Sequence, residues 1–430
     1  MRDPEMATTV AWKPILAGEA AANAEKSVLE IAEGFREEAW SPERVLHSLS
    51  GGSSGLAIFY HELAQRWPES GFDALRDRYW NAAIDSLANS QYPIPNLYSG
   101  FTGVGWATAF LSPEDPAETG ADDAHEELEE ALLESLKSVR DPADYDLING
   151  PSGWGLYALE RWPHPRAIRA LELTVDFFEQ RAERVSEGIR WHTAPQLLPE
   201  WQREQSPNGY YNMGLSHGMP GVWVLLAHTF VRGIRPRASQ ELLEGSVRWG
   251  LAQKWSGDNP TAFPSMVNEE PATPPAVRLA WCYGDLGVAS ALHLAGQLTQ
   301  RADWMEEAVS IVRRASTLTH EVSRNVDCGL CHGTAGVAHV FNRFYHATGE
   351  EAFAKAAAYW IGVTLDMRVD GIGPGRYAAW RHEPTPGWHA MAGLLEGSSG
   401  IGLALLTAIG RREPSWDRFL YISSVPMANR

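Results

Sequence analysis

Cysteine is scarce in this chain: Cys282, Cys328 and Cys331 are the only three among 430 residues. So few thiols, and an odd number of them, exclude the disulfide framework with which small secreted domains compensate for a small core. Unpaired thiols are typical of a reducing compartment. We therefore expect a cytoplasmic protein.

Long hydrophobic runs are also missing. The most apolar stretches, 222–231 and 401–410, are each about ten residues long, whereas a membrane-spanning helix needs about 20. The N-terminal residues, MRDPEMATTVAWKPILAGEA, place acidic residues beside the early arginine and contain no continuous apolar core. We therefore expect neither a signal peptide nor a transmembrane segment.

Basic residues are too few to balance the acidic ones. The chain has 36 Lys and Arg against 54 Asp and Glu, a formal net charge of −18. A chain this acidic has no general attraction for phosphate backbones, which argues against a nucleic-acid partner. Ten acidic residues and no basic one lie between 114 and 134. We interpret that segment as a solvated loop followed by an exposed helix, whose N-terminus favours acidic residues.

Glycine, by contrast, forms an internal repeat. The pattern Gly-x-x-Gly followed by a strongly apolar run occurs seven times, with its first glycine at 52, 100, 150, 218, 284, 333 and 397. Each apolar run of 8 to 12 residues is apolar nearly all round, as is typical of a helix buried on every side. Because the repeat covers about 45–410, we expect one domain spanning 1–430 in place of the roughly three that length alone suggests.

Amphipathic stretches alternate with these apolar runs. They lie at 19–36, 74–89, 124–139, 166–184, 239–254, 303–320 and 350–366. Seven buried helices alternating with seven one-sided helices predict an all-α fold, the α,α-toroid, with the buried helices inside and the amphipathic helices outside. Glycine would supply a positive φ where needed and let neighbouring inner helices start close together.

The spacing of the repeat also predicts where a site would form. If every inner helix begins at a GxxG turn, all seven turns gather at one mouth of the ring. Three intervals of 64 to 68 residues exceed the baseline of 48 to 50. The extra length falls in 185–215, 255–283 and 367–396, which we expect to form longer loops or small strands at that same mouth.

All three cysteines lie in two neighbouring glycine turns, RLAWCYGDLG and CGLCHGTAG. Two thiolates and one imidazole suit zinc, and three protein ligands leave a fourth position open for water or substrate. Our preferred set is Cys282, Cys331 and His332, because it ties two inner hairpins together. Cys328 and Cys331 form a CxxC that could supply both thiolates instead, and buried cysteines can also be small hydrophobic residues without a metal.

Four more residues in the glycine turns are candidates for catalysis: Asp146, His217, Arg278 and Tyr283. Each has a structural alternative. His217 could be a hydrogen-bonded core histidine, and Asp146 could cap the third inner helix. Arg278 and Tyr283 could pack the rim.

Together these motifs resemble the lanthionine synthetase C-like family, the lanthipeptide cyclases. WCYG at 281–284, CHG at 331–333, GLSHG at 214–218 and YDLINGPSG at 145–153 carry the resemblance. It implies an α,α-toroid with one zinc ion held by Cys282, Cys331 and His332, and active-site roles for Asp146, His217, Arg278 and Tyr283. Its substrate would be a dehydrated precursor peptide with a leader, and a dehydratase and a transporter would be partners in a membrane-associated biosynthetic complex.

The sequence departs from the family at two places. WCYG is often followed by x-Pro-Gly in the family, whereas this chain has Asp285-Leu286-Gly287, which predicts a shifted turn. Cys328 lies outside the family motif, which leaves an alternative ligand set or a redox pair open. Some members carry a small SH2-like insertion, for which the connections from Val185 and Trp255 are the candidates.

The resemblance implies addition of a peptide cysteine to dehydroalanine or dehydrobutyrine, which forms a thioether ring. A zinc-bound thiol is deprotonated and can attack. We hypothesise that His217, oriented by Asp146, protonates Cα of the resulting enolate, that Arg278 stabilises the enolate, and that Tyr283 is a second candidate donor.

Three alternatives have the same fold. A family member could add an external thiol such as glutathione, and a toroid could bind zinc and peptide without turnover. A glycosidase would need paired carboxylates at the mouth, where only Asp146, Asp285 and Glu396 are available, and would leave the thiols without a purpose.

Overall fold

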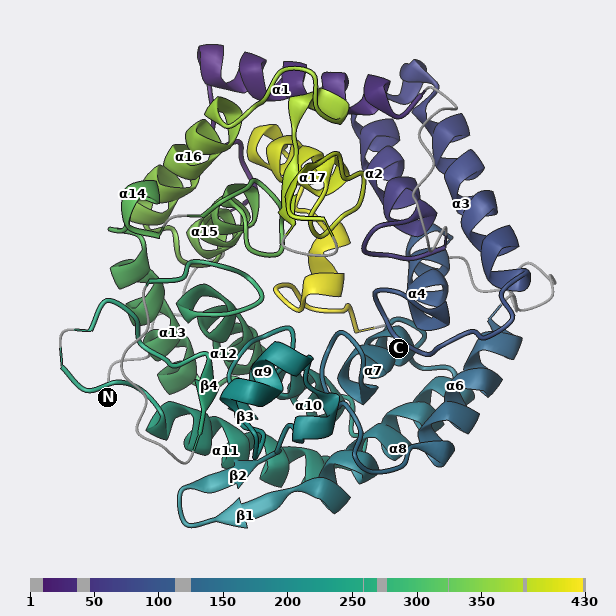
Figure 1. Cartoon of the computed structure of the whole chain (residues 1–430), viewed down its shortest axis with the longest axis vertical. Helices are drawn as coiled ribbons and strands as arrows, with labels where there is room; N and C mark the ends of the chain where they lie inside the picture. Colours follow the sequence, from purple (N-terminus) through teal and green to yellow (C-terminus); the bar gives the residue numbers. More distant parts are fainter. Residues whose placement is uncertain are drawn as a thin grey trace.

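The computed structural model describes residues 11–36, 47–112, 125–257, 259–268, 277–323, 325–381 and 385–427. Helices dominate these residues and form two concentric rings (Figure 1). The predicted α,α-toroid is confirmed.

Every inner helix begins directly after the first glycine of a GxxG turn. The seven are α2 (Ser53–Arg66), α4 (Phe101–Leu111), α7 (Pro151–Glu160), α10 (Met219–Val231), α12 (Asp285–Thr299), α15 (Thr334–Thr348) and α17 (Ser398–Ile409). They are buried on nearly all sides, and in α17 no residue is exposed. The apolar runs thus form the inner ring because each can be covered completely.

The outer helices are the amphipathic stretches. They are α1 (Gly18–Gly34), α3 (Phe72–Ala88), α6 (Glu126–Ser138), α8 (Pro165–Arg181), α11 (Pro236–Ala252), α13 (Ala302–Ala315) and α16 (Glu351–Asp366). The acidic segment ends in α6 as expected, although Glu129 is buried and pairs with Arg161 at 2.9 Å. The loop predicted at 113–124 lies outside the described residues.

The two ends of the chain close the ring. The outer helices α3, α8, α11, α13 and α16 each pack on the inner helix that precedes them, whereas α1 packs on α17. The inner helix α17 in turn contacts α2. The first outer helix therefore completes the last hairpin.

Small strands occur only in the long connections, among the described residues. They pair as β1 (Glu183–Val185) with β2 (Gly188–Arg190), β3 (Tyr211–Asn212) with β4 (Met266–Val267), and β5 (Ala379–Arg381) with β6 (Gly387–His389). The β3–β4 pair joins two different connections, 185–215 and 255–283, at the same mouth. The short helices α9 (Glu200–Gln205), α14 (His320–Ser323), η2 (Pro195–Leu197) and η3 (Pro374–Arg376) also lie in connections leading to that mouth, whereas η1 (Pro68–Ser70) lies between α2 and α3.

The second glycine of each repeat is needed because its own connection passes close to it. A Cβ at Gly103 would lie 2.0 Å from the Leu97 carbonyl oxygen, and one at Gly400 would lie 1.9 Å from that of Leu394. A positive φ was the other expected reason for glycine. Among the repeat glycines only Gly284 has one, at φ +88°. Close backbone approach is therefore the main requirement for glycine in this fold.

No helix in the described ranges is both long and apolar enough to cross a bilayer.

Candidate metal centre

The seven GxxG turns are hydrogen-bonded to one another in a circle. Six backbone bonds join neighbouring turns: Ser50 N–H to Tyr98 O (3.0 Å), Leu147 to Ser216 (3.1 Å), Ser216 to Cys282 (3.3 Å), Cys282 to Cys331 (3.1 Å), Cys331 to Leu395 (2.9 Å) and Leu395 to Ser50 (3.3 Å). The remaining junction is made by side chains, with Asn96 Nδ2 donating to Asn149 Oδ1 at 3.1 Å. Residues at equivalent positions of neighbouring repeats are therefore brought side by side.

Cys282 and Cys331 occupy one such equivalent position, two residues before the glycine. Together with His332 they form a cluster whose ligating atoms all lie within 4.8 Å of one another. Cys282 is buried, while Cys331 and His332 are partly exposed to the mouth. Two sulfurs and one imidazole are a donor set that suits zinc, so this cluster could hold a metal ion.

The cluster is strongly coupled electrostatically. The hydrogen bond between the two thiols lowers the pKa of Cys282 far below its usual value and raises that of Cys331. The hydrogen bond of His332 with Cys282 raises the imidazole pKa to about 8. The Cys282 thiolate is therefore stabilised by two neighbours, one of which is cationic below about pH 8.

Cys328 lies apart from this cluster. It is buried, its Sγ lies 3.9 Å from the Thr364 carbonyl oxygen, and burial raises its pKa to about 12. Cys328 does not belong to the group of ligand atoms that gather within 4.8 Å of one another. The geometry favours the set containing Cys282 over the CxxC alternative.

His217 and Asp146 form a hydrogen-bonded pair beside the cluster. His217 Nδ1 lies 2.6 Å from Asp146 Oδ2. Burial acts to lower the pKa of His217, but the hydrogen bond and charge of Asp146 outweigh it and raise the pKa. The other oxygen of Asp146 accepts the backbone N–H groups of Asn149 (2.6 Å) and Gly150 (3.2 Å). Asp146 therefore fixes its turn and orients the imidazole as well.

Tyr283 connects this pair to the cysteine cluster. Its ring stacks with that of His217 at a centroid distance of 6.1 Å, and the Arg278 guanidinium carbon lies 5.6 Å from the Tyr283 ring centroid. Asn212 Nδ2 donates to the phenolic oxygen at 3.0 Å. Burial raises the pKa of Tyr283, so the phenol keeps its proton. All seven candidate residues thus belong to one neighbourhood.

Two carboxylates lie beside the cluster in roles that the sequence motifs did not indicate. His217, Tyr283 and His332 each directly precede a repeat glycine, and Glu396 holds the same position in the seventh repeat. Its negative charge raises the pKa values of Cys331 and His332. The buried Asp327 places Oδ2 3.9 Å from His332 Nε2. The shared register could have revealed Glu396, whereas nothing in the sequence distinguishes Asp327.

Asp285, the departure from the family motif, has a structural role. Its buried carboxylate accepts the backbone N–H groups of Ala262 (2.8 Å) and Phe263 (3.2 Å) and lies 3.3 Å from Arg314. Asp285 therefore holds the connection between α11 and α12 against the start of α12.

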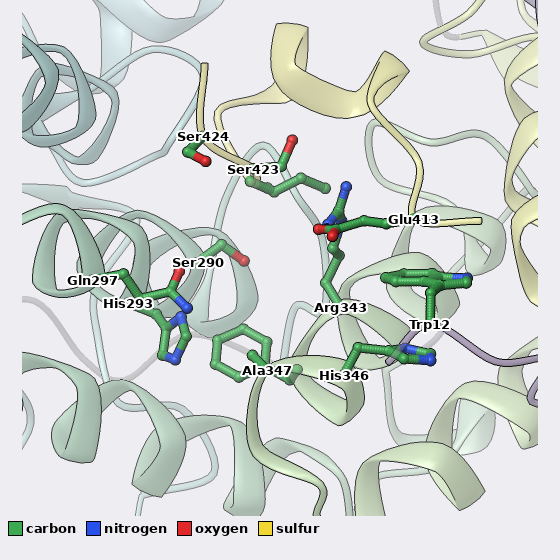
Figure 2. A pocket seen from close by; sticks show the side chains of 12 residues that line it. Trp12, Ser290, His293, Gln297, Arg343, His346, Ala347, Glu413, Ser423 and Ser424 are labelled. Carbon is green, nitrogen blue, oxygen red and sulfur yellow. The ribbon is translucent and has the colours of Figure 1, made fainter. Parts of the chain in front are cut away.

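A separate cavity of about 170 Å³ lies towards the opposite ends of the inner helices (Figure 2). His293 from α12, His346 from α15 and Ser423 near the C-terminus line it, and Arg343 forms an ion pair there with Glu413 at 2.6 Å. None of the seven candidate residues lines this cavity. The candidate chemistry is confined to the mouth with the glycine turns.

The family model described as "Lanthionine synthetase C-like protein" matches residues 45–421. The chain belongs to this family. The lanthionine synthetase C-like resemblance read from the motifs is thereby confirmed, and it extends past the last GxxG helix into the C-terminal residues.

Two individual relatives agree with this assignment. The nisin biosynthesis protein NisC of Lactococcus lactis subsp. lactis is 24% identical over 326 residues, covering 71% of this chain and 75% of NisC. A solved structure of nisin cyclase superimposes with a TM-score of 0.72 at 20% identity, covering 93% of this chain and 97% of the other. At that identity the structural match shows a shared fold.

Proposed function

We propose that this protein is a zinc-dependent lanthipeptide cyclase. It would add cysteine thiols of a dehydrated precursor peptide to dehydroalanine or dehydrobutyrine, forming lanthionine and methyllanthionine thioether rings. The observation that carries the proposal is the Cys282, Cys331 and His332 cluster beside the His217–Asp146 pair. The likeness to a nisin biosynthesis protein supports a peptide substrate.

Cys282, Cys331 and His332 would hold the zinc ion. The chemistry of this donor set fits zinc and leaves a fourth position open. When bound there, zinc lowers the pKa of a substrate thiol so that the thiolate forms at neutral pH. Asp327 Oδ2 lies 3.9 Å from His332 Nε2 and places a negative charge beside the imidazole.

The remaining residues would handle the charge and the proton. Attack of the substrate sulfur on Cβ moves the electrons of the double bond onto the adjacent carbonyl as an enolate, which is resolved when a proton reaches Cα. His217 is the proposed donor, because Asp146 occupies its Nδ1 and raises its pKa. Arg278 would stabilise the enolate, and Tyr283 is the second candidate donor.

The proposed substrate implies partners. A leader-bearing precursor must first be dehydrated by a lanthipeptide dehydratase, and the product must then be exported by a transporter. We propose that this protein acts in the cytoplasm with these two proteins, which would bring it to the membrane.

The test combines metal analysis with thiol counting. The purified protein is expected to contain one zinc per chain and to consume the free thiols of a dehydrated cysteine-containing peptide without added glutathione. Thiol loss is measured as the fraction that still reacts with an alkylating agent, by mass spectrometry. The Cys331→Ala variant should abolish both zinc binding and thiol loss, whereas Cys328→Ala is the matched control and should retain both.

Two results would support a different function. Peptide modification that requires glutathione, with a mass increase of one glutathione, supports external thiol addition. A zinc-loaded protein that leaves every peptide thiol free contradicts the cyclase proposal and supports a binding scaffold.

A further inference from the structure

The residues after α17, here called the C-terminal segment (residues 412–427), fold back into the ring. In Figure 1 they are the yellow trace inside the inner helices. The segment contains the 3₁₀ helix η4 (Trp416–Leu420), in which Asp417 and Phe419 are completely buried. Since α17 starts at the mouth and ends at the opposite end, the segment enters from that opposite end.

Charged groups anchor the base of the segment to the inner helices α2, α7 and α10. Arg412 pairs with Glu62 of α2 at 2.7 Å, and Arg418 pairs with Glu160 of α7 at 2.5 Å. Arg232, at the end of α10, donates to the carbonyl oxygens of Val425 (2.9 Å) and Pro426 (3.0 Å).

Asp417 has the most hydrogen-bond partners of the residues that anchor the segment. Its carboxylate accepts hydrogen bonds from Arg343 (2.7 Å) and Ser423 (2.7 Å) and lies 2.7 Å from His339 Nε2. Arg343 and His339 both belong to α15. A buried carboxylate with so many partners is rigid, because each partner would lose its own hydrogen bond if the carboxylate moved.

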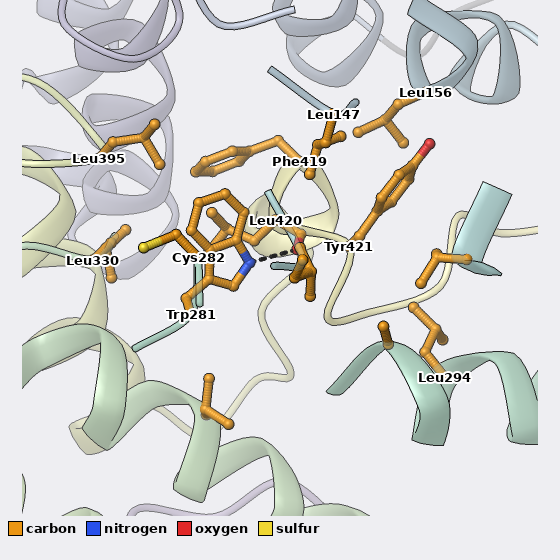
Figure 3. Close-up of a cluster of buried hydrophobic side chains, with 14 of the residues drawn as sticks. Leu147, Leu156, Trp281, Cys282, Leu294, Leu330, Leu395, Phe419, Leu420 and Tyr421 are labelled. Atoms are coloured by element: carbon orange, nitrogen blue, oxygen red, sulfur yellow. Dashed lines mark hydrogen bonds between the residues drawn. The ribbon is translucent and has the colours of Figure 1, made fainter. Parts of the chain in front are cut away.

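The apex of the segment reaches three glycine turns. Tyr98 donates to the Phe419 carbonyl at 2.5 Å, and Tyr421 donates to the Ser152 carbonyl at 2.8 Å. The indole N–H of Trp281 donates to the Leu420 carbonyl at 2.7 Å (Figure 3). Tyr98, Ser152 and Trp281 lie in the second, third and fifth repeats.

Trp281 directly precedes the proposed ligand Cys282. Its own backbone N–H and that of Cys282 both donate to the Cys331 carbonyl at 3.1 Å. Trp281 is therefore held at two points. Its indole N–H donates to the Leu420 carbonyl, and its backbone N–H donates to the Cys331 carbonyl in the neighbouring turn.

From these contacts we infer that the C-terminal segment is an internal brace for the metal centre, and that Trp281 is a positioning residue acting through the Leu420 carbonyl. The brace fixes the position of Cys282 relative to Cys331 and His332. The inference rests on the proposed function, since it assumes that these three residues bind a metal.

The variant Trp281→Phe removes the indole N–H and keeps an aromatic ring. Trp223→Phe is the matched control: Trp223 is equally buried, and its indole nitrogen has no hydrogen-bond partner among the described residues. Each protein is loaded with Co²⁺, whose visible absorption reports the geometry of thiolate ligation. We expect Trp281→Phe to shift these bands and to weaken Co²⁺ binding about tenfold, the usual effect of changing a group behind a metal ligand. Trp223→Phe should keep the wild-type spectrum and affinity.

A second variant acts from the far end of the brace. Asp417→Asn removes the charge at the anchor, distant from the metal ligands in the chain, and should shift the Co²⁺ bands in the same direction as Trp281→Phe. Spectra that stay unchanged in both variants, or that change equally in Trp223→Phe, overturn the brace. Failure of the wild-type protein to bind Co²⁺ overturns the metal centre and the brace together, whereas wild-type binding with unaltered variant spectra overturns the brace alone.

Discussion

Two side chains at the mouth, His217 and Tyr283, are the candidate proton donors in the proposed reaction. His217 has one nitrogen engaged by Asp146 and a raised pKa, whereas Tyr283 is held by Asn212 and stacked on the same imidazole. Their closeness makes either a conceivable donor. The carboxylate partner distinguishes them, because only the imidazole has a neighbouring carboxylate that raises its pKa.

Replacing His217 should therefore slow the chemical step. His217→Asn is expected to lower the kcat of ring formation by about 10²–10⁴-fold, the range of general acid catalysis, with zinc content unchanged. Tyr283→Phe serves as the comparison and should have the smaller effect. Cyclisation by His217→Asn at the wild-type rate would move the donor role to Tyr283.

Metal binding should depend on pH through the protons that the metal-free ligands carry, and that of His332 is one of them. Its pKa of about 8 in the metal-free protein means that the imidazole carries a proton below that pH, and this proton must leave before a metal can bind. The apparent zinc affinity is therefore expected to fall as the pH is lowered from 8.5 to 6.5. Chelator competition at several pH values measures this, and an affinity independent of pH in that range would contradict it.

At the scale of helices and turns, the glycine pattern predicted most of what the structure contains. All seven inner helices start one residue after a predicted glycine, and the outer helices end within a few residues of the predicted limits, because apolar periodicity reports directly on burial. The individual strand pairs were not predictable, since β3 and β4 are two residues each and come from different connections.

Glycine at the second repeat position is open to a direct test. In Gly103→Ala the new Cβ would meet the Leu97 carbonyl at 2.0 Å, and we expect destabilisation of about 3 kcal/mol. Gly362 lies inside α16 with open space around its missing Cβ, so Gly362→Ala should stabilise the protein by about 0.5–1 kcal/mol. Urea unfolding midpoints compare the two, and equal shifts would refute the steric explanation.

At the scale of the whole molecule, the sequence predicted one domain over 1–430, but the repeat on which that prediction rests ended near residue 410, and the course of the C-terminal segment was not predicted. Its stabilising contacts are polar and distant in sequence: Asp417 meets α15, Arg418 meets α7 and Arg412 meets α2. Such pairs leave no periodic pattern. The motifs, by contrast, led to the hypothesis that Asp146 orients His217, and the structure places the two side chains 2.6 Å apart.

The segment should also make stability depend on acid. Its charged partners hold the pKa of Asp417 well below the ordinary value despite complete burial. A depressed pKa contributes stability above the unfolded value of about 3.9, and this contribution is lost as the pH falls below it. Asp417→Asn should lower the thermal unfolding midpoint at pH 7, and the difference from the wild type should shrink below about pH 4. A difference independent of pH would assign the effect to packing.

The pairing of α1 with α17 bears on the order in which the molecule can be made. The outer helix α1 leaves the ribosome first, and the inner helix that covers its apolar face is synthesised last. Until then α1, whose Val28 and Ile31 are fully buried in the finished ring, lacks the inner helix on which it packs. The circle of turn-to-turn hydrogen bonds likewise lacks its seventh member until α17 emerges. The backbone N–H of Cys331, which donates to the Leu395 carbonyl in the finished ring, thus gains its partner only when the last repeat has been synthesised.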